Sequence, residues 1–138
     1  MIRVATRADL ERIGEIRMAV RENRLTQPAK IVDQVEWLID RDGFWVWDQD
    51  GTIQGFSSAD PRDGSIFALF IDPDFEGRGA GQALLAAACA ALKGAGHCKA
   101  WLTTGHGTRA ERFYRLNGWA ATGLADNGQI VFEKGFAG

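Results

Sequence analysis

The chain has 138 residues, of which 46% are hydrophobic and 25% are charged. This length and balance predict an ordinary soluble globular protein with one domain over residues 1–138. The 16 basic and 18 acidic residues give a net charge of −2, so no nucleic-acid partner is expected, because nucleic acid selects a basic face.

The N-terminal segment predicts a strand followed by a helix. Residues 2–5 indicate a short strand. Thr6 and Asp9 stand three residues apart, as in a capping box, and indicate the start of a helix. Apolar residues then recur at helical spacing, so this helix is expected to end near Glu22 or Asn23.

A loop, a second helix and a hairpin are predicted next. Residues 25–28 are expected to form a loop, because the proline that closes this segment disfavours helix in the residue before it. Asp33 is predicted to begin the second helix. The aromatic and β-branched run 44–47 indicates a strand, and the Asp-Gly pair at 50–51 predicts a tight turn into a return strand over 52–59.

The middle of the chain predicts a buried strand, a glycine-rich loop and a helix. After a turn at 60–64, residues 66–71 are nearly all apolar and are therefore expected to form a central strand buried on both faces. The glycine loop, residues 76–81, follows this strand. An alanine- and leucine-rich helix is predicted over 82–93, ended by two glycines.

The last third predicts a strand, a helix and a hairpin. The strand spans 99–103 and the helix spans 108–117. An Asn-Gly pair at 127–128 predicts the turn between strands near 119–125 and 129–134. The predicted order of elements is β-α-α-β-β-β-α-β-α-β-β.

The position of the glycine loop predicts an anion-binding site. A strand enters the loop and a helix leaves it, so free backbone amides and the helix dipole face a ligand there. Glycine lets phosphate oxygens approach these amides, and the guanidinium of Arg78 adds a positive charge. Two other phosphate loops are excluded. No lysine follows as a Walker loop requires, and Gln82 stands where a dinucleotide-binding fingerprint needs its third glycine.

Two motifs, in this order, resemble those of the GNAT superfamily of N-acetyltransferases. Glu76-x-x-Gly79-x-Gly81 fits the pattern Q/R-x-x-G-x-G/A except for its glutamate. Residues 108–119, Thr-Arg-Ala-Glu-Arg-Phe-Tyr-Arg-Leu-Asn-Gly-Trp, are similar to the pattern A-x-x-F-Y-x-x-x-G-[FW]. The resemblance covers essentially the whole chain. It implies an α/β (α+β) fold with a mixed, mostly antiparallel central sheet of about six or seven strands flanked by about four helices.

The resemblance also implies an activity and a donor site. It implies an acetyl-CoA-dependent N-acetyltransferase that moves the acetyl group directly to an amine of a small molecule, peptide or protein, without an acyl-enzyme and without a metal. The backbone of Leu69 and Ile71 would pair with the pantetheine arm as a neighbouring strand does, and Glu76 is expected to point away from the pyrophosphate. The implied donor-binding residues are Leu69, Phe70, Ile71, Gly77, Arg78, Gly79, Ala80, Gly81, Gln82 and Thr108.

Tyr114 matches the tyrosine of the family and is the predicted acid for the leaving CoA thiolate. From its local pattern alone, a buried core tyrosine explains Tyr114 as well. The general base stays open among Glu22, Asp60, Glu111 and His106, because the strand 66–71 carries no carboxylate.

The acceptor site is expected between the first two helices and the centre of the sheet, as the resemblance implies. Arg17, Arg21, Glu22 and Asn23 are its candidate residues, although a solvated helix face also explains this cluster. The alternative function is a non-catalytic acyl-CoA-binding regulatory module, which the unusual Glu76 favours.

The two cysteines and the apolar runs limit the remaining possibilities. Cys89 and Cys98 do not have the spacing of zinc ligands, so free thiols in a reducing cytoplasm are expected. No apolar run is long enough to cross a membrane, so no membrane partner is expected. The family resemblance allows a homodimer.

Overall fold

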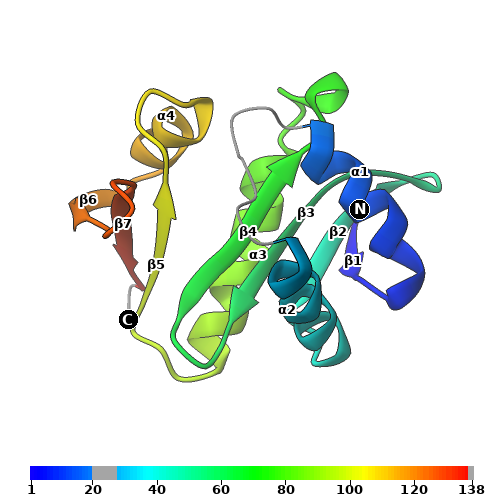
Figure 1. The fold of residues 1–138 in the computed structure, drawn as a ribbon, viewed down its shortest axis with the longest axis horizontal. Helices are drawn as coiled ribbons and strands as arrows, with labels where there is room; N and C mark the ends of the chain where they lie inside the picture. Colours follow the sequence, from blue (N-terminus) through cyan, green and yellow to red (C-terminus); the bar gives the residue numbers. More distant parts are fainter. Residues whose placement is uncertain (20–27, 137–138) are drawn as a thin grey trace.

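The computed structural model describes residues 1–19 and 28–136, and side chains within them except those of 28–33. Seven strands form one sheet in the order β1-β2-β3-β4-β5-β7-β6, in which β4 and β5 are the parallel neighbours (Figure 1). The strands are β1 (Ile2–Val4), β2 (Phe44–Gln49), β3 (Thr52–Asp60), β4 (Ser65–Ile71), β5 (Lys99–Thr104), β6 (Ala120–Leu124) and β7 (Ile130–Gly135). The helices are α1 (Leu10–Ala19), α2 (Pro28–Asp40), α3 (Ala80–Gly94) and α4 (Arg109–Leu116), with short 3-10 turns η1 (Arg7–Asp9) and η2 (Pro73–Phe75).

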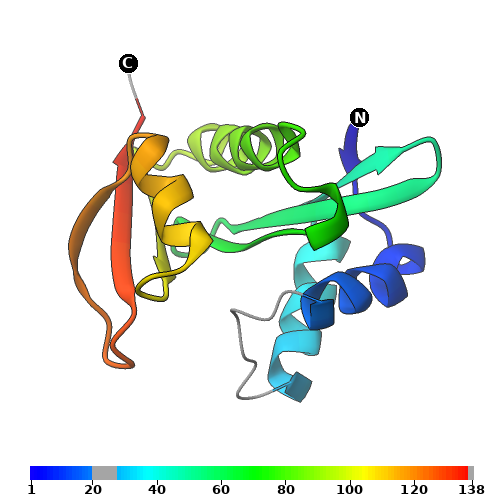
Figure 2. The same ribbon diagram turned by 90° about the horizontal axis from the view of Figure 1, so that it is seen from above.

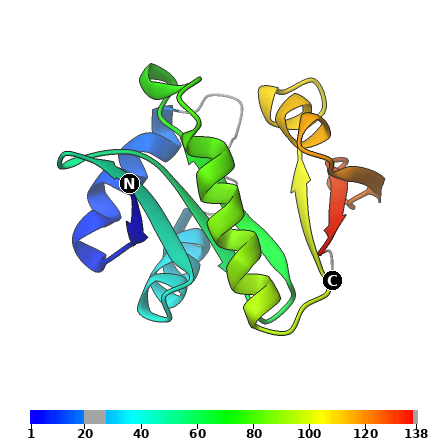
Figure 3. The same ribbon diagram turned by 180° about the vertical axis from the view of Figure 1, so that it is seen from behind.

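Helices cover both faces of the first four strands. Figure 2 shows α3 on one face and α1 with α2 on the other, and Figure 3 shows α3 lying across β3 and β4 from behind. Ile13 and Ile16 of α1 and Leu38 of α2 are buried against the sheet residues Phe44 and Phe56. This pattern is that of amphipathic helices, whose apolar residues recur every three or four positions and so share one face.

A second core joins α3 to β5, β7 and α4. It contains Leu85, Ala88 and Leu92 of α3, together with Tyr114 of α4 and Phe132 of β7. Because α3 follows β4 and precedes β5 in the chain, it is the crossover that makes these two strands parallel.

The order of elements expected from the sequence is confirmed, and both predicted hairpin turns form. Asp50 and Gly51 have φ values of 53° and 89°, as a two-residue turn between antiparallel strands requires. At the N-terminus, the backbone amide of Thr6 donates to Asp9 Oδ2 at 2.8 Å, so the predicted capping contact forms, with a 3-10 turn preceding α1. The predicted end of this helix and the loop from 25 to 27 lie outside the described residues.

The start of the second helix was predicted wrongly. Helix α2 begins at Pro28, not at Asp33. Proline suits the first position of a helix, because that position needs no amide donor and proline already has a helical φ. The restriction that proline places on the preceding residue therefore marks the helix start here.

The burial predicted for β4 is also wrong over most of its length. Ser65 and Ile66 are buried, but residues 67–71 are only half-buried. The reason is that β5 pairs with β4 at a single position, Ser65 with Trp101, and then diverges from it (Figure 1). An apolar sequence cannot report this divergence, since it depends on the position of another strand.

Candidate active site

The divergence of β4 and β5 opens a cavity of about 450 Å³ between the end of β4, the glycine loop and α4. Its lining residues are Leu69, Phe70, Ile71, Phe75, Glu76, Gly77, Arg78, Gly79, Ala80, Gly81, Gln82, Thr108, Arg109, Ala110, Phe113 and Tyr114. Every residue predicted for donor binding is in this set, and so is Tyr114. Sequence patterns therefore identified residues that the fold brings together at one cavity.

The backbone of β4 faces the cavity with alternate residues. The amide of Asp72 donates to the carbonyl of Gln54 at 2.9 Å, which directs Asp72 toward β3. Since successive residues of a strand direct their amide and carbonyl to opposite sides, Ile71 and Leu69 direct theirs away from β3. On that side β5 pairs with β4 only at Ser65, so among the described residues no strand accepts the hydrogen bonds that these two residues direct away from β3. Leu69 and Ile71 therefore present unused strand hydrogen-bonding groups to the cavity.

The glycine loop adopts a conformation that glycine favours. Gly77 and Gly79 have φ values of 79° and 83°, in the left-handed region. A Cβ at either position would meet no atom within 4 Å, so the space beside the loop is open. Glycine is favoured at these positions because of the positive φ, not because of crowding. Helix α3 begins at Ala80, and its first amides have no acceptor within the helix. The loop thus places free backbone amides and a helix N-terminus beside the cavity, an arrangement that favours an anion.

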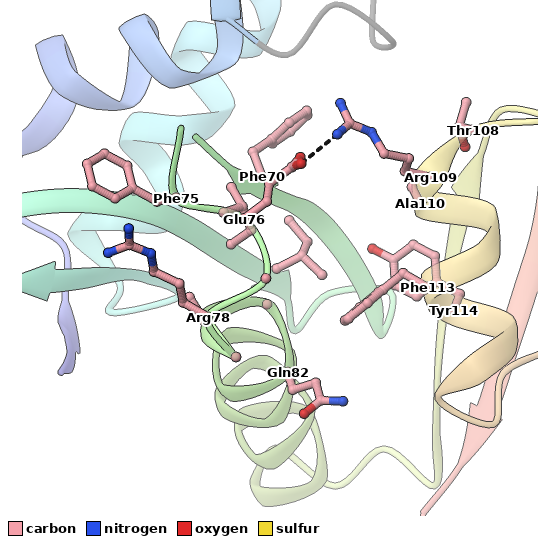
Figure 4. Close-up of a pocket in the computed structure, with 16 residues that line it drawn as sticks. Phe70, Phe75, Glu76, Arg78, Gln82, Thr108, Arg109, Ala110, Phe113 and Tyr114 are labelled. Atoms are coloured by element: carbon pink, nitrogen blue, oxygen red, sulfur yellow. Dashed lines mark hydrogen bonds and ion pairs between the residues drawn. The ribbon is translucent and has the colours of Figure 1, made fainter. Parts of the chain in front are cut away.

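The two charged residues of the loop point in different directions (Figure 4). The guanidinium carbon of Arg78 lies 5.4 Å from the centroid of the Phe75 ring. Glu76 extends toward α4, where its Oε2 lies 2.5 Å from Nη1 of Arg109. The glutamate at this motif position is therefore neutralised by a cation from the opposite wall of the cavity.

Thr108 lines the cavity, but its hydroxyl caps the N-terminus of α4. The hydroxyl accepts from the amide of Glu111 at 3.1 Å and donates to the carbonyl of Gly105 at 2.9 Å. Thr108 is thus the N-cap of α4, a position at which threonine satisfies an otherwise unpaired helix amide. Because the hydroxyl makes these two bonds, Thr108 contributes to the cavity mainly as part of its wall.

Tyr114 combines a buried ring with a hydroxyl at the cavity. Its side chain is 5% exposed, and its ring lies 5.4 Å from Phe113, 5.6 Å from Trp119 and 6.0 Å from Phe132, between ring centroids. The hydroxyl points toward the space beside the glycine loop (Figure 4). Burial raises the pKa of Tyr114 well above its ordinary value, so the phenol keeps its proton at neutral and mildly alkaline pH.

Two of the four candidates for the general base, Asp60 and Glu111, have carboxylates that accept hydrogen bonds away from the cavity. Asp60 accepts from Arg62 and from Gln34, and the bonds from Arg62 hold the pKa of its carboxyl below the usual range. Glu111 accepts from the amide of Gly107, which lowers its pKa. A lowered pKa makes a carboxylate a weaker base, and neither residue lines the cavity. His106 is exposed and does not line it either.

The candidate acceptor residues are only partly described. Arg17 lies half-buried on α1 and does not line the cavity, and burial lowers the pKa of its guanidinium. Arg21, Glu22 and Asn23 lie outside the described residues.

The two cysteines are free thiols, and possible metal ligands among the described residues do not form a cluster. Cys89 is half-buried and its pKa is raised by burial, which reduces the thiolate fraction, while Cys98 is exposed. In residues 1–19 and 34–136, no group of three or more His, Cys, Asp or Glu side chains is arranged to hold a metal ion. None of the described helices has the length and apolar character needed to cross a membrane.

Comparison with known proteins identifies the family. The sequence matches the model of the Acetyltransferase (GNAT) family over residues 10–119. The chain belongs to the GNAT family of acetyltransferases. It is therefore an acyltransferase, and the resemblance inferred from the two motifs is confirmed. A comparison with curated proteins found no match.

Solved structures share the fold of this GNAT acetyltransferase. PaiA N-acetyltransferase from Thermoplasma acidophilum, in complex with coenzyme A, has a TM-score of 0.77 and 18% identity, covering 99% of this chain and 98% of that one. Ard1 from Thermoplasma volcanium has a TM-score of 0.78 and 22% identity, covering 96% and 93%. N-acetylglutamate synthase from Neisseria gonorrhoeae, complexed with coenzyme A and N-acetyl-glutamate, has a TM-score of 0.76 and 17% identity, covering 98% of this chain and 34% of that one. The predicted fold class is thereby confirmed.

Sequence reasoning about this GNAT acetyltransferase missed several lining residues. Phe75, Ala110 and Phe113 add apolar surface to the cavity, and Arg109 adds a positive charge. Ala110 and Phe113 belong to the second motif, so their position was available as a signal. Arg109 directly precedes the alanine of that motif, but nothing local indicates that it reaches Glu76.

Proposed function

We propose that this GNAT acetyltransferase takes its acetyl group from acetyl-CoA and transfers it directly to an amine. The observation that carries the proposal is the continuity of the cavity. The unpaired backbone groups of Leu69 and Ile71 lead to the free amides of the glycine loop, and the Tyr114 hydroxyl faces the same space. CoA has matching chemistry, with an amide-containing arm that ends in a pyrophosphate.

The donor would be held by hydrogen bonds that the fold leaves free. The pantetheine arm would bond to Leu69 and Ile71, while the pyrophosphate would accept from amides of residues 77–82. Each bond to a charged oxygen contributes about 1.5–3 kcal/mol, and the helix dipole adds about 0.3–1 kcal/mol. Several such bonds explain how a chain of net charge −2 can bind a polyanion.

The transfer would use the amine itself as the nucleophile. Its nitrogen attacks the thioester carbon, the carbon–sulfur bond breaks, and the electron pair leaves with the CoA sulfur. A backbone amide of β4 would polarise the carbonyl oxygen, and the Tyr114 hydroxyl would donate its hydrogen to the departing thiolate. The amine reacts only after losing its ammonium proton, which passes to water or to a base. After the attack the nitrogen releases a second proton as the amide forms, and a proton from solvent restores the Tyr114 phenol.

The acceptor is proposed to be an amine of a small molecule, peptide or protein that reaches the thioester from the side of α1 and α2. Arg17, Arg21, Glu22 and Asn23 are the proposed contacts for its polar groups. The PaiA N-acetyltransferase and the Neisseria N-acetylglutamate synthase support acetyl transfer to amines in this fold, and they leave the acceptor of this chain open.

Donor binding is tested by thermal unfolding. Millimolar CoA or acetyl-CoA should raise the melting temperature clearly, because a ligand that binds the native state stabilises it. Gly79→Asp should abolish this shift by placing a carboxylate at the anion site, and Gly94→Asp, remote from the cavity, serves as the control. No shift with the native chain would reject acetyl-CoA as the donor.

Catalysis is tested by release of free CoA thiol from acetyl-CoA across a panel of amines, peptides and aminoglycosides. Turnover with at least one acceptor, together with acetylated product by mass spectrometry, supports the proposal. Tight donor binding without thiol release across the whole panel would instead favour the non-catalytic acyl-CoA-binding module.

A further inference from the structure

An ion pair joins two segments that line the cavity. Glu76 belongs to the loop that follows β4, and Arg109 is the first residue of α4, 33 positions later in the chain. Their side chains meet at 2.5 Å, and both residues line the cavity (Figure 4). The side chain of Glu76 is 40% exposed and that of Arg109 is 64% exposed, so the ion pair is accessible to solvent.

A carboxylate at this place conflicts with an anion site. Glu76 directly precedes Gly77, whose amide belongs to the proposed pyrophosphate loop. A donor phosphate there would be repelled by Glu76, whereas the guanidinium of Arg109 would attract it. Arg109 therefore offers the donor a positive charge in addition to that of Arg78, and in this structure the Arg109 guanidinium is paired with Glu76.

The exchange of one anion for another at Arg109 is energetically accessible. An exposed ion pair typically contributes at most about 1 kcal/mol, since water competes for both charges. A phosphate offers a guanidinium a bidentate contact, which is stronger and more directional than most exposed carboxylate pairs. A phosphate delivered to the cavity by the donor can therefore displace the carboxylate.

We propose that Arg109 is a phosphate-binding residue of the donor site, and that Glu76 is its internal counter-ion, displaced when the donor binds. This inference rests on the proposed use of acetyl-CoA. The phosphate is either the pyrophosphate or the 3′-phosphate of CoA, both of which present the same chemistry to Arg109. Glu76 then acts as a competitor that weakens donor binding.

A persistent bridge is the opposite possibility and makes a different prediction. If Glu76 and Arg109 stayed paired over the bound donor, each would support binding, and removal of either would weaken it. In an exchange the two substitutions act in opposite directions. The sign of the Glu76→Gln effect therefore separates the two arrangements.

The test is calorimetric titration of the full chain with CoA and with 3′-dephospho-CoA. Arg109→Gln should weaken CoA binding by about tenfold, the equivalent of one charge-assisted hydrogen bond, and Arg109→Lys should recover part of this loss. Glu76→Gln should tighten binding by about threefold, because the competitor is gone. Persistence of the Arg109→Gln effect with dephospho-CoA assigns the contact to the pyrophosphate, and its disappearance assigns it to the 3′-phosphate.

Two exposed residues that do not line the cavity control for net charge. Asp74→Asn changes a carboxylate three residues after β4, and Arg112→Gln changes an arginine on α4. Each should alter the affinity by less than about twofold, because exposed charges beyond contact are screened.

Three results would overturn the inference. If Glu76→Gln weakened CoA binding, the persistent bridge would be established. If Arg109→Gln left CoA binding unchanged, Arg109 would not belong to the donor site. If the two control substitutions changed the affinity equally, the effects at Glu76 and Arg109 would be explained by net charge alone. These results differ from failure of the proposed function, in which the native chain binds neither CoA nor acetyl-CoA.

Discussion

At the scale of single residues, Tyr114 shows how burial prepares a group for one role. Its ring lies among Phe113, Trp119 and Phe132, which fixes the direction of its hydroxyl. The same burial disfavours the phenolate and raises the pKa of Tyr114. A phenol that holds its proton is suited to donate to a departing thiolate and unsuited to serve as the base.

Tyr114→Phe should lower kcat by about 10²–10⁴ fold, the usual contribution of a positioned acid, and leave acetyl-CoA affinity nearly unchanged. In the native enzyme the protonated form should persist to above pH of about 10, the ordinary pKa of tyrosine, so no loss of rate from Tyr114 is expected below it. Thiol release followed from pH 6 to 10, with calorimetry of donor binding, measures both. An unchanged kcat in Tyr114→Phe would leave Tyr114 as a core residue only.

At the scale of elements, the position of β4 depends on a glycine in β3. A Cβ added at Gly55 would lie 2.6 Å from Cδ1 of Ile71 and 2.9 Å from the carbonyl oxygen of Phe70. The second contact is with backbone, which cannot move aside as a flexible side chain does. Gly55 therefore sets how closely β3 approaches the part of β4 that lines the cavity.

Gly55→Ala should destabilise the protein by about 1–3 kcal/mol, the usual cost of overpacking, and should weaken donor binding because β4 must shift. Gly14→Ala is the matched control. A Cβ there meets no atom within 4 Å in α1, and alanine should stabilise the helix by about 0.5–1 kcal/mol. Urea unfolding measures both, and stability unchanged by Gly55→Ala would show that β3 and β4 separate without cost.

Local pattern was sufficient to predict most elements and to select residues that line one cavity, because turns, caps and glycine loops are determined by neighbouring residues. The Asp-Gly turn at 50–51 and the loop at 76–81 are examples. Contacts between distant segments were not predictable in this way. The half-buried state of β4 depends on where β5 goes, and the pairing of Glu76 with Arg109 depends on how α4 is placed. Even the start of α2 at Pro28 required choosing between two roles of proline.

At the scale of the whole molecule, the sheet consists of two parts that are connected by few strand-pairing contacts. Strands β1 to β4 form one part and β5 to β7 the other, and β4 pairs with β5 only at Ser65 and Trp101. The indole nitrogen of Trp101 adds a bond to the carbonyl of Asp63 at 2.9 Å, near the same point. The donor, in the proposed arrangement, would occupy the gap and join the two parts.

Hydrogen exchange of the β4 amides tests whether the donor connects the two parts of the sheet. The amides of Leu69 and Ile71 should exchange at least about tenfold more slowly with saturating CoA, because the donor supplies the acceptors that β5 does not. The amide of Asp72 already donates to Gln54 and should change less, which makes it an internal control on the same segment. Equal exchange at Leu69 and Ile71 with and without CoA would contradict strand-like pairing of the pantetheine arm.

The unpaired stretch of β4 also has a consequence for solubility. A strand whose amides and carbonyls lack partners is a template on which another extended chain can add, and proteins usually protect such edges with charge or by covering them. Here the edge lies in the middle of the sheet, beside apolar residues such as Phe70 and Ile71, and charge is confined to its end. We therefore expect the protein to self-associate through added strands more readily without a donor than with one, because a bound donor would cover this edge.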